Sequence, residues 1–224
     1  MQDIFLGYKE DKFNITVHKE DYSEIKCGVK GYLWDGLTEH QLLKIRNTLY
    51  HELIHIREME QIPSDIHKRL TEVRSMARMG YILLNEYVAY YEANLIYPEL
   101  PSDLNSSDEE ILNLFYKHMT KGFLTIGGRT RRTESDEWKF FEACYDNFSA
   151  LIPKYIICGC IGDGSEPYVQ LNKAVQQLAQ YYHDRNSLTV SDYEKIGREF
   201  IDTIIYDLSS YKRKTFWSNT GIYI

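Results

Sequence analysis

Apolar and polar positions follow two different patterns in the first third of the chain. The stretches at 13–17 (FNITV) and 25–33 (IKCGVKGYL) are β-rich and are separated by turn-forming residues. From Thr38 onward apolar residues recur at helical spacing, and Thr38 followed by Gln41 has the form of a capping box. The pattern predicts two or three short strands and then a helix from Thr38 to about Met59.

The rest of the chain reads as helical. A second long helical stretch is predicted from about Asp65 to Tyr97, where prolines end the pattern. Three further helix starts have a Ser or Thr followed three residues later by an acidic residue: Ser107 with Glu110, Thr133 with Asp136, and Ser191 with Glu194. They predict helices over 108–121, 134–152 and 192–212, and another is expected near 167–183. The expected fold class is α+β, mainly α, with a small N-terminal β element.

The length of 224 residues allows one large domain or two joined subdomains. We expect residues 1–100, with the strands and the first two long helices, to form an N-terminal subdomain. Residues 101–224 are then a helical C-terminal subdomain. Both are expected to belong to one compact unit.

The charge balance disfavours one class of partner. Lys and Arg total 26 and Asp and Glu total 33, which gives a net charge of −7. A negative chain is a poor general binder of nucleic acid or anionic membranes. Two short loops, 129–132 and 212–214, are basic despite the negative charge of the chain, but short charged loops of this kind are usually solvated. We expect no nucleic-acid or membrane partner, and the oligomeric state stays open.

The compartment is predicted from what the sequence lacks. The first residues show no basic segment followed by an apolar one, and no stretch has the roughly 18 apolar residues of a membrane span. Four cysteines are too few for a disulfide scaffold in a chain of this length. They are Cys27, Cys144, Cys158 and Cys160. These features predict a cytoplasmic protein with reduced, mostly buried thiols.

Residues 51–55 read HELIH and match H-E-x-x-H within the first predicted helix. His51 and His55 lie one turn apart on one helix face, so their imidazoles can share one tetrahedral ion, for which zinc is expected. Glu52 is rotated by about 100° from His51 and can reach a water on the metal instead. This geometry suits hydrolysis, because the metal acidifies the water and Glu52 accepts its proton.

A catalytic zinc usually has a third protein ligand, and the next long helix offers two candidates. Glu86 and Glu92 lie six residues apart, about 120° around the helix, so they cannot both face the same ion. Glu86 is favoured because Ala89 and Ala93 follow on its own side and allow a close approach to the first helix. Glu92 stays as the alternative.

H-E-x-x-H with a downstream glutamate on a second helix resembles the gluzincin metallopeptidases. The phrase TLYHELIH resembles, in particular, the ImmA/IrrE-like and phage or mobile-element zincins. The resemblance covers residues 38–97 and implies zinc held by His51, His55 and Glu86, with Glu52 as the general base. It also implies a zincin-like metal core of two packed helices.

The sequence departs from the ImmA/IrrE pattern in two ways. The gap to the ligand helix is longer, and no helix-turn-helix segment is recognised. Glu92-Ala93-Asn94 does resemble the E-A-N phrase of that family, which is a second reason to keep Glu92 as an alternative.

The expected function is therefore that of a zinc-dependent hydrolase, an intracellular metallopeptidase that acts on a protein or peptide. An extended substrate would pair with the strand at 25–33. His118, His183, Tyr90 and many other tyrosines are eligible to stabilise the developing oxyanion, and the sequence does not choose among them. The alternative is a non-catalytic zincin scaffold with a binding or regulatory role in a phage or mobile element.

Overall fold

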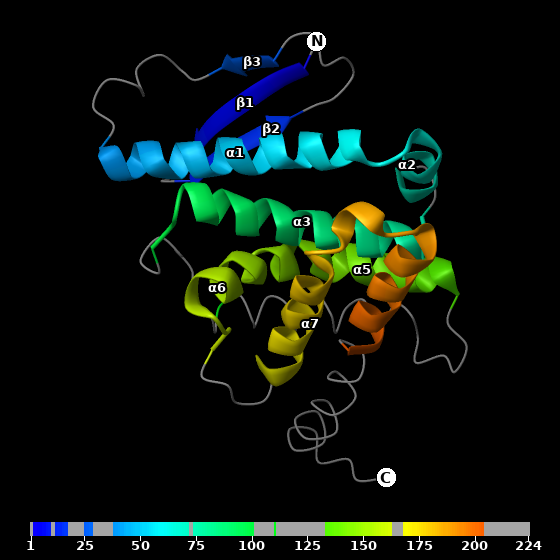
Figure 1. The fold of residues 1–224 in the computed structure, drawn as a ribbon. Helices are drawn as coiled ribbons and strands as arrows, with labels where there is room; N and C mark the ends of the chain where they lie inside the picture. Colours follow the sequence, from blue (N-terminus) through cyan, green and yellow to red (C-terminus); the bar gives the residue numbers. More distant parts are fainter. Residues whose placement is uncertain are drawn as a thin grey trace.

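A computed structural model describes most of the chain (Figure 1). The described residues are 2–9, 12–17, 25–28, 38–71, 74–100, 110, 133–162 and 168–203. The predicted helix over 108–121 lies outside them except for residue 110, and both basic loops lie outside them as well. So do His118 and residues 29–33 of the second predicted strand.

Three strands and a set of helices make up this part of the chain. The strands β1 (Gln2–Lys9), β2 (Lys12–Val17) and β3 (Ile25–Gly28) have the order β2-β1-β3, with β1 antiparallel to β2 and parallel to β3. The helices are α1 (Glu39–Gln61), α2 (Ser64–Thr71), α3 (Met76–Ile96), α5 (Glu134–Ser149), α6 (Leu151–Cys158) and α7 (Tyr168–Tyr181), followed by the 3-10 turn η3 (Arg185–Ser187) and a helix over 190–203. The described chain is mainly helical, as predicted. None of its helices combines the length and the hydrophobicity that crossing a membrane would need.

Helix α1 begins where the sequence predicts it. Thr38 is the N-cap: the backbone N–H of Gln41 donates to Thr38 Oγ1 at 3.2 Å, and the backbone N–H of Thr38 donates to Gln41 Oε1 at 2.9 Å. These two bonds satisfy N–H groups that would otherwise have no partner at the helix end. The helix start that precedes the histidines is therefore fixed by the local sequence.

The single long helix predicted over 65–97 is wrong, because the chain forms α2 and α3 instead. Ser75 has extended backbone angles and its Oγ accepts from the N–H of Arg78 at 3.2 Å. A serine side chain that bonds the backbone in this way caps a new helix rather than continuing an old one. Helix α3 therefore starts at Met76 and carries Glu86 in its middle.

Two other helix boundaries also differ from the prediction. The helix predicted over 134–152 divides into α5, which ends at Ser149, and α6. The helix predicted to start at 192 starts at 190, because Thr189 and not Ser191 is its cap. The backbone N–H of Thr189 donates to Asp192 Oδ2 at 2.8 Å, and Thr189 Oγ1 accepts from the N–H of Asp192 at 3.4 Å.

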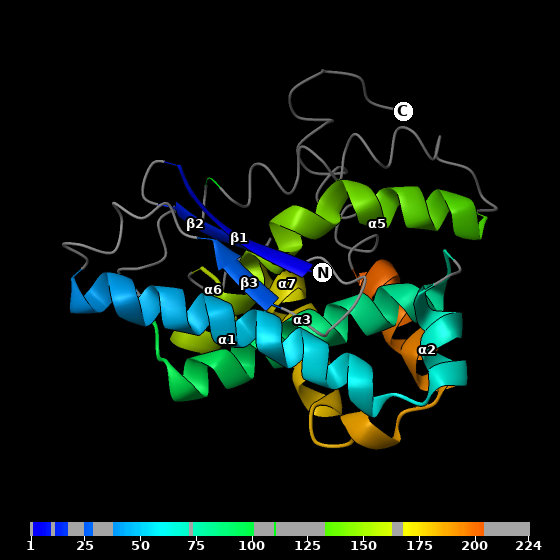
Figure 2. The same cartoon turned by 90° about the horizontal axis from the view of Figure 1, so that it is seen from above.

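Helix α3 lies at the centre of the described fold. Figure 1 and Figure 2 show α1 running antiparallel along one side of α3, while α5, α6 and α7 lie on its other side. The strands lie against the face of α1 that points away from α3 (Figure 1). The division into subdomains at residue 100 stays a prediction.

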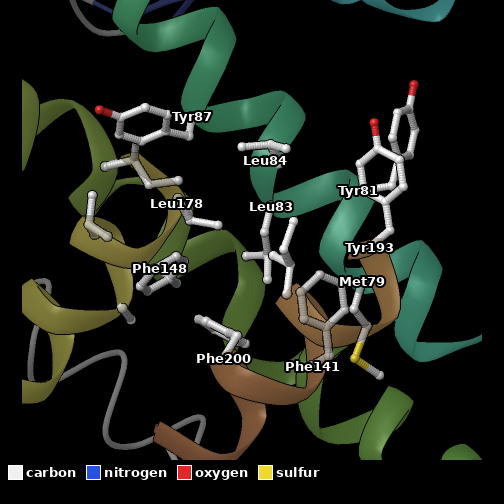
Figure 3. Close-up of a cluster of buried hydrophobic side chains, with 14 of the residues drawn as sticks. Met79, Tyr81, Leu83, Leu84, Tyr87, Phe141, Phe148, Leu178, Tyr193 and Phe200 are labelled. Atoms are coloured by element: carbon white, nitrogen blue, oxygen red, sulfur yellow. The ribbon is translucent and has the colours of Figure 1, made fainter. Parts of the chain in front are cut away.

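The apolar core lies mainly between α3 and the later helices. Leu83 on α3, Phe148 on α5 and Leu178 on α7 are among its fully or almost fully buried side chains (Figure 3). Burying such side chains stabilises the fold by about 1.5–3 kcal/mol each. Because α3 is held in this core, Glu86 is presented from a fixed helix rather than from a loop.

Two glycines allow α3 and the helix over 190–203 to touch through their backbones. A Cβ built on Gly80 would overlap the carbonyl oxygen of Tyr193, and one built on Gly197 would overlap the carbonyl oxygen of Met76. The two helices therefore pack more closely than any larger residue at these positions permits.

The prediction that the thiols are buried is wrong for Cys158 and Cys160. Cys158 and Cys160 are free thiols, and both are exposed. They flank Gly159, which ends α6 with a left-handed backbone conformation at φ 74°. Gly159 is exposed as well, so the C-terminal end of α6 lies at the surface.

Candidate metal centre

The two motif histidines meet on the side of α1 that faces α3. The Nε2 atoms of His51 and His55 lie 3.0 Å apart, and the ring centroids are 4.6 Å apart with nearly perpendicular planes. His51 is only 7% exposed, and His55 is half-buried. The spacing of four residues therefore does what the sequence predicts and brings two imidazole nitrogens to one point.

Glu86 of α3 completes the group. Its Oε2 lies 3.7 Å from His51 Nε2 and its Oε1 lies 3.6 Å from His55 Nε2. Ala89 and Ala93 are fully buried on the same helix, as expected for residues that let α3 approach α1 closely. His51, His55 and Glu86 form a group that could hold a metal ion.

The spacing of the two imidazole nitrogens and the Glu86 carboxylate is close to that of ligands around a tetrahedral ion. Two ligand atoms at about 2 Å from such an ion lie about 3.3 Å apart. The two nitrogens are 3.0 Å apart, and each lies 3.6 or 3.7 Å from one of the two Glu86 oxygens. Burial, together with the nearby His55, lowers the pKa of His51, so that its imidazole is neutral and able to bind a metal. Three protein ligands leave a fourth position for a water or a substrate atom.

Glu52 lies beside this group rather than in it. Burial raises the pKa of Glu52, and the nearby Glu86 also raises it, while His55 acts in the opposite direction. Glu52 is half-buried, and its carboxyl is close enough to His55 and Glu86 for their charges to act on it. A general base at a metal-bound water needs this position and a pKa moved toward neutrality.

Glu92, the alternative third ligand, points elsewhere. Its Oε2 accepts from Arg57 Nη1 at 2.7 Å, and its Oε1 accepts from Arg185 Nη2 at 2.8 Å and from Tyr182 Oη at 3.1 Å. The structure therefore brings Glu86, and not Glu92, to the two histidines.

Glu92 belongs to a charged cluster that joins α1, α3 and the η3 turn. We call Arg57, Glu58, Glu92 and Arg185 the arginine–glutamate cluster. Arg57 also contacts Glu58, Arg185 Nε lies 3.4 Å from Glu58 Oε2, and the Arg185 guanidinium stacks 4.4 Å from the centroid of the Tyr182 ring. The charges of the two arginines and the two glutamates in this cluster cancel. Sequence reasoning misses this cluster because its members lie up to 128 positions apart, as from Arg57 to Arg185, and no local pattern links them.

The cluster predicts an acid-sensitive contribution to stability. Burial alone would raise the pKa of Glu92, but the bonds and charges of Arg57, Tyr182 and Arg185 outweigh it and lower the pKa. A lowered folded-state pKa stabilises the fold above the unfolded pKa, and this contribution is lost as the pH falls through the folded value. We expect Glu92→Gln to reduce the free energy of unfolding by about 2 kcal/mol at pH 7, because it leaves partly buried guanidinium groups without their carboxylate.

This difference should begin to shrink once the pH falls below about 4, where Glu92 takes up a proton in the unfolded chain, and it should disappear as the pH falls through the lowered pKa of Glu92 in the folded protein. Urea unfolding of both proteins between pH 3 and 7 measures it. Glu194→Gln, which removes only an exposed contact to Arg198, is the control and should change little at any pH. A Glu92→Gln effect that does not vary with pH would contradict the assignment.

Tyr90, one of the residues eligible to stabilise the oxyanion, lies beside His51. The ring of Tyr90 packs against His51 with centroids 4.3 Å apart. Burial raises the pKa of Tyr90, and Glu86 adds to the effect, so the hydroxyl stays protonated and can donate a hydrogen bond. His183, by contrast, is exposed and packs against Tyr182.

Comparison with known proteins adds no family to this geometry. No protein-family model matches the chain, and neither does any curated protein or solved structure.

Proposed function

We propose that the protein is a zinc-dependent hydrolase, most simply an intracellular metallopeptidase. The observation that carries the proposal is the convergence of His51 Nε2, His55 Nε2 and the Glu86 carboxylate into a group that could hold a metal ion. Glu52 follows His51 in the sequence and is close enough to His55 and Glu86 for their charges to act on its carboxyl. Neutral imidazoles with one carboxylate are the donor set that zinc takes in hydrolases. The proposal extends the resemblance to gluzincins, and includes a zincin-like core in which the N-terminal strands accompany the two helices.

The chain's own residues have distinct roles in this proposal. His51, His55 and Glu86 would hold the zinc, which when bound supplies an acidified water and polarises a carbonyl. Glu52 would serve as the general base toward that water and then as the general acid toward the leaving amine. Tyr90 packs on His51 and holds its ring in place, and its protonated hydroxyl is the group on this side that could donate to the developing oxyanion.

Glu52→Gln is the variant that tests the hydrolytic role. The purified protein is expected to contain about one zinc per chain. Glu52→Gln should keep the zinc but reduce peptide hydrolysis by at least about 100-fold, because general-base catalysis contributes about 10²–10⁴-fold. Metal analysis and a fluorogenic peptide library, read together, measure both quantities.

Glu60→Gln is the matched control, since Glu60 is an exposed residue at the end of the same helix. It should leave both zinc content and hydrolysis unchanged. Wild-type protein that binds no zinc would overturn the proposal as a whole. Zinc-loaded protein whose hydrolysis is unaffected by Glu52→Gln would overturn the role of Glu52.

A second candidate is a zincin scaffold that binds metal without turnover, in a regulatory or binding role. One observation favours it: the Nδ1 atoms of His51 and His55 are buried and have no hydrogen-bond partner in the part of the chain that the structure describes. Catalytic zinc histidines usually donate this N–H to a carboxylate or carbonyl, which orients the ring. Zinc binding without any hydrolysis in the experiment above would select this candidate.

A further inference from the structure

A second polar site lies at a small cavity between α1, α3 and the η3 turn. Five polar side chains line it: Glu58, Tyr81, Asn85, Arg185 and Tyr193. The cavity borders the arginine–glutamate cluster, of which Glu58 and Arg185 are members. None of these residues belongs to the metal group.

Three buried polar atoms at this cavity have no hydrogen-bond partner among the residues that the structure describes, the 3.4 Å contact of Arg185 Nε with Glu58 being an ion pair without hydrogen-bond geometry. They are Tyr81 Oη, Asn85 Oδ1 and Arg185 Nε. Tyr81 is only 6% exposed. Buried polar groups in folded proteins are almost always paired, and a set of unpaired ones around a cavity indicates a bound polar partner.

The two tyrosines present their hydroxyl groups at the same end. Figure 3 shows the rings of Tyr81 and Tyr193 beside each other with both oxygens pointing the same way, and their centroids are 5.8 Å apart. Burial raises the pKa of both hydroxyls, in the case of Tyr193 to about 12, and the nearby Glu58 adds to the rise. Both groups therefore remain protonated and can donate.

The charges around the cavity define what it can hold. The arginine–glutamate cluster is balanced, so the site offers no net attraction to a cation or to an anion. The lining supplies donors from Tyr81 and Arg185 and an acceptor from Asn85, and there is room for about one water molecule. The occupant has to be small and neutral, and has to accept and donate hydrogen bonds.

We propose that this cavity is a binding site for one ordered water molecule, held by Tyr81 Oη, Asn85 Oδ1 and Arg185 Nε. The water accepts from Tyr81 and from Arg185 and donates to Asn85, which satisfies all three atoms. It connects α3 to the η3 turn and lies beside Glu58 of α1. The site does not depend on zinc, so its test is separate from that of the proposed function.

A high-resolution crystal structure of the full chain is the direct test. We expect density for one water within about 3.2 Å of Asn85 Oδ1 and of Arg185 Nε. Three results would overturn the proposal: an empty cavity, side chains that pair directly with one another, or an ion identified by anomalous scattering or by its coordination distances.

Water relaxation dispersion tests the same site in solution. The wild-type protein should show a long-lived buried water, and Asn85→Leu, which fills the site with a similar volume and removes an acceptor, should lose one water equivalent. Tyr87→Phe is the control: Tyr87 is as buried as Tyr81 on the same helix but does not line the cavity, so the water should stay. Equal dispersion from wild type and Asn85→Leu would refute the proposal, and the crystal structure decides the matter if Asn85→Leu does not fold.

Discussion

His51→Ala and Glu86→Gln are each expected to weaken zinc binding by more than about 100-fold. Losing only a residue that supports a metal ligand costs about 10–100-fold in affinity, so losing a ligand itself should cost more. The alanine removes one imidazole, and the glutamine replaces a charged oxygen by a neutral amide. Competition with a chromogenic chelator at pH 7 measures the dissociation constant for each variant.

Glu92→Gln is the matched control for Glu86→Gln. Each change removes one carboxylate charge from α3, at positions six residues apart. Glu92 is bound by Arg57 and Arg185 and does not reach the histidines. Its variant should keep zinc affinity within a few-fold of wild type once circular dichroism shows that it is folded. If Glu92→Gln lost zinc and Glu86→Gln kept it, the third ligand would be Glu92.

The metal group could be predicted from the sequence because its chemistry is local on each helix. Four-residue spacing places His51 and His55 on one face, and the small residues after Glu86 indicate which carboxylate can come close. Both inferences use the helix period alone. The separations of 3.6 and 3.7 Å between Glu86 and the two histidines depend on how α1 and α3 pack, and no local pattern contains that information.

The helix boundaries show where sequence reasoning stops. Thr38 and Thr133 are caps that the sequence identifies, and the structure has the hydrogen bonds at both. Ser75 and Thr189 cap helices through the same side-chain chemistry. The hydrophobic pattern continues across Ser75 and hides the break there, and Ser191 offers a competing cap close to Thr189. Which hydroxyl caps a helix is then decided by tertiary packing.

The arginine–glutamate cluster and the cavity beside it were beyond prediction for another reason. Arg185 reaches Glu58 and Glu92 from a turn more than 90 positions away. Nothing near Arg185 in the sequence distinguishes it from a solvated arginine. Only the packing of the later helices on α3 brings it there, and the same packing encloses Tyr81 and Asn85.

Gly80→Ala is expected to destabilise the protein by about 3 kcal/mol, because overpacking a close contact typically costs about 1–3 kcal/mol and here the neighbour is backbone. The sign of this change in stability separates the effect of the close contact from that of helix propensity. In an unconstrained helix the same change would stabilise by about 1 kcal/mol, since alanine is the better helix former. The carbonyl oxygen of Tyr193 lies where the new Cβ would be, so the contact should outweigh the propensity. Thermal and urea unfolding give the difference.

Gly197→Ala should also destabilise, because its Cβ would meet the carbonyl of Met76 at the same crossing. Once one alanine has forced the two helices apart, the second meets less resistance, so the double variant should lose less than the sum of the single losses. Gln176→Ala, at an exposed position of α7, is the control and should stay within about 0.5 kcal/mol of wild type. A gain in stability at Gly80 would mean that α3 and the helix over 190–203 do not cross at these glycines. The side of α3 that carries Gly80 would then have to be packed in another way.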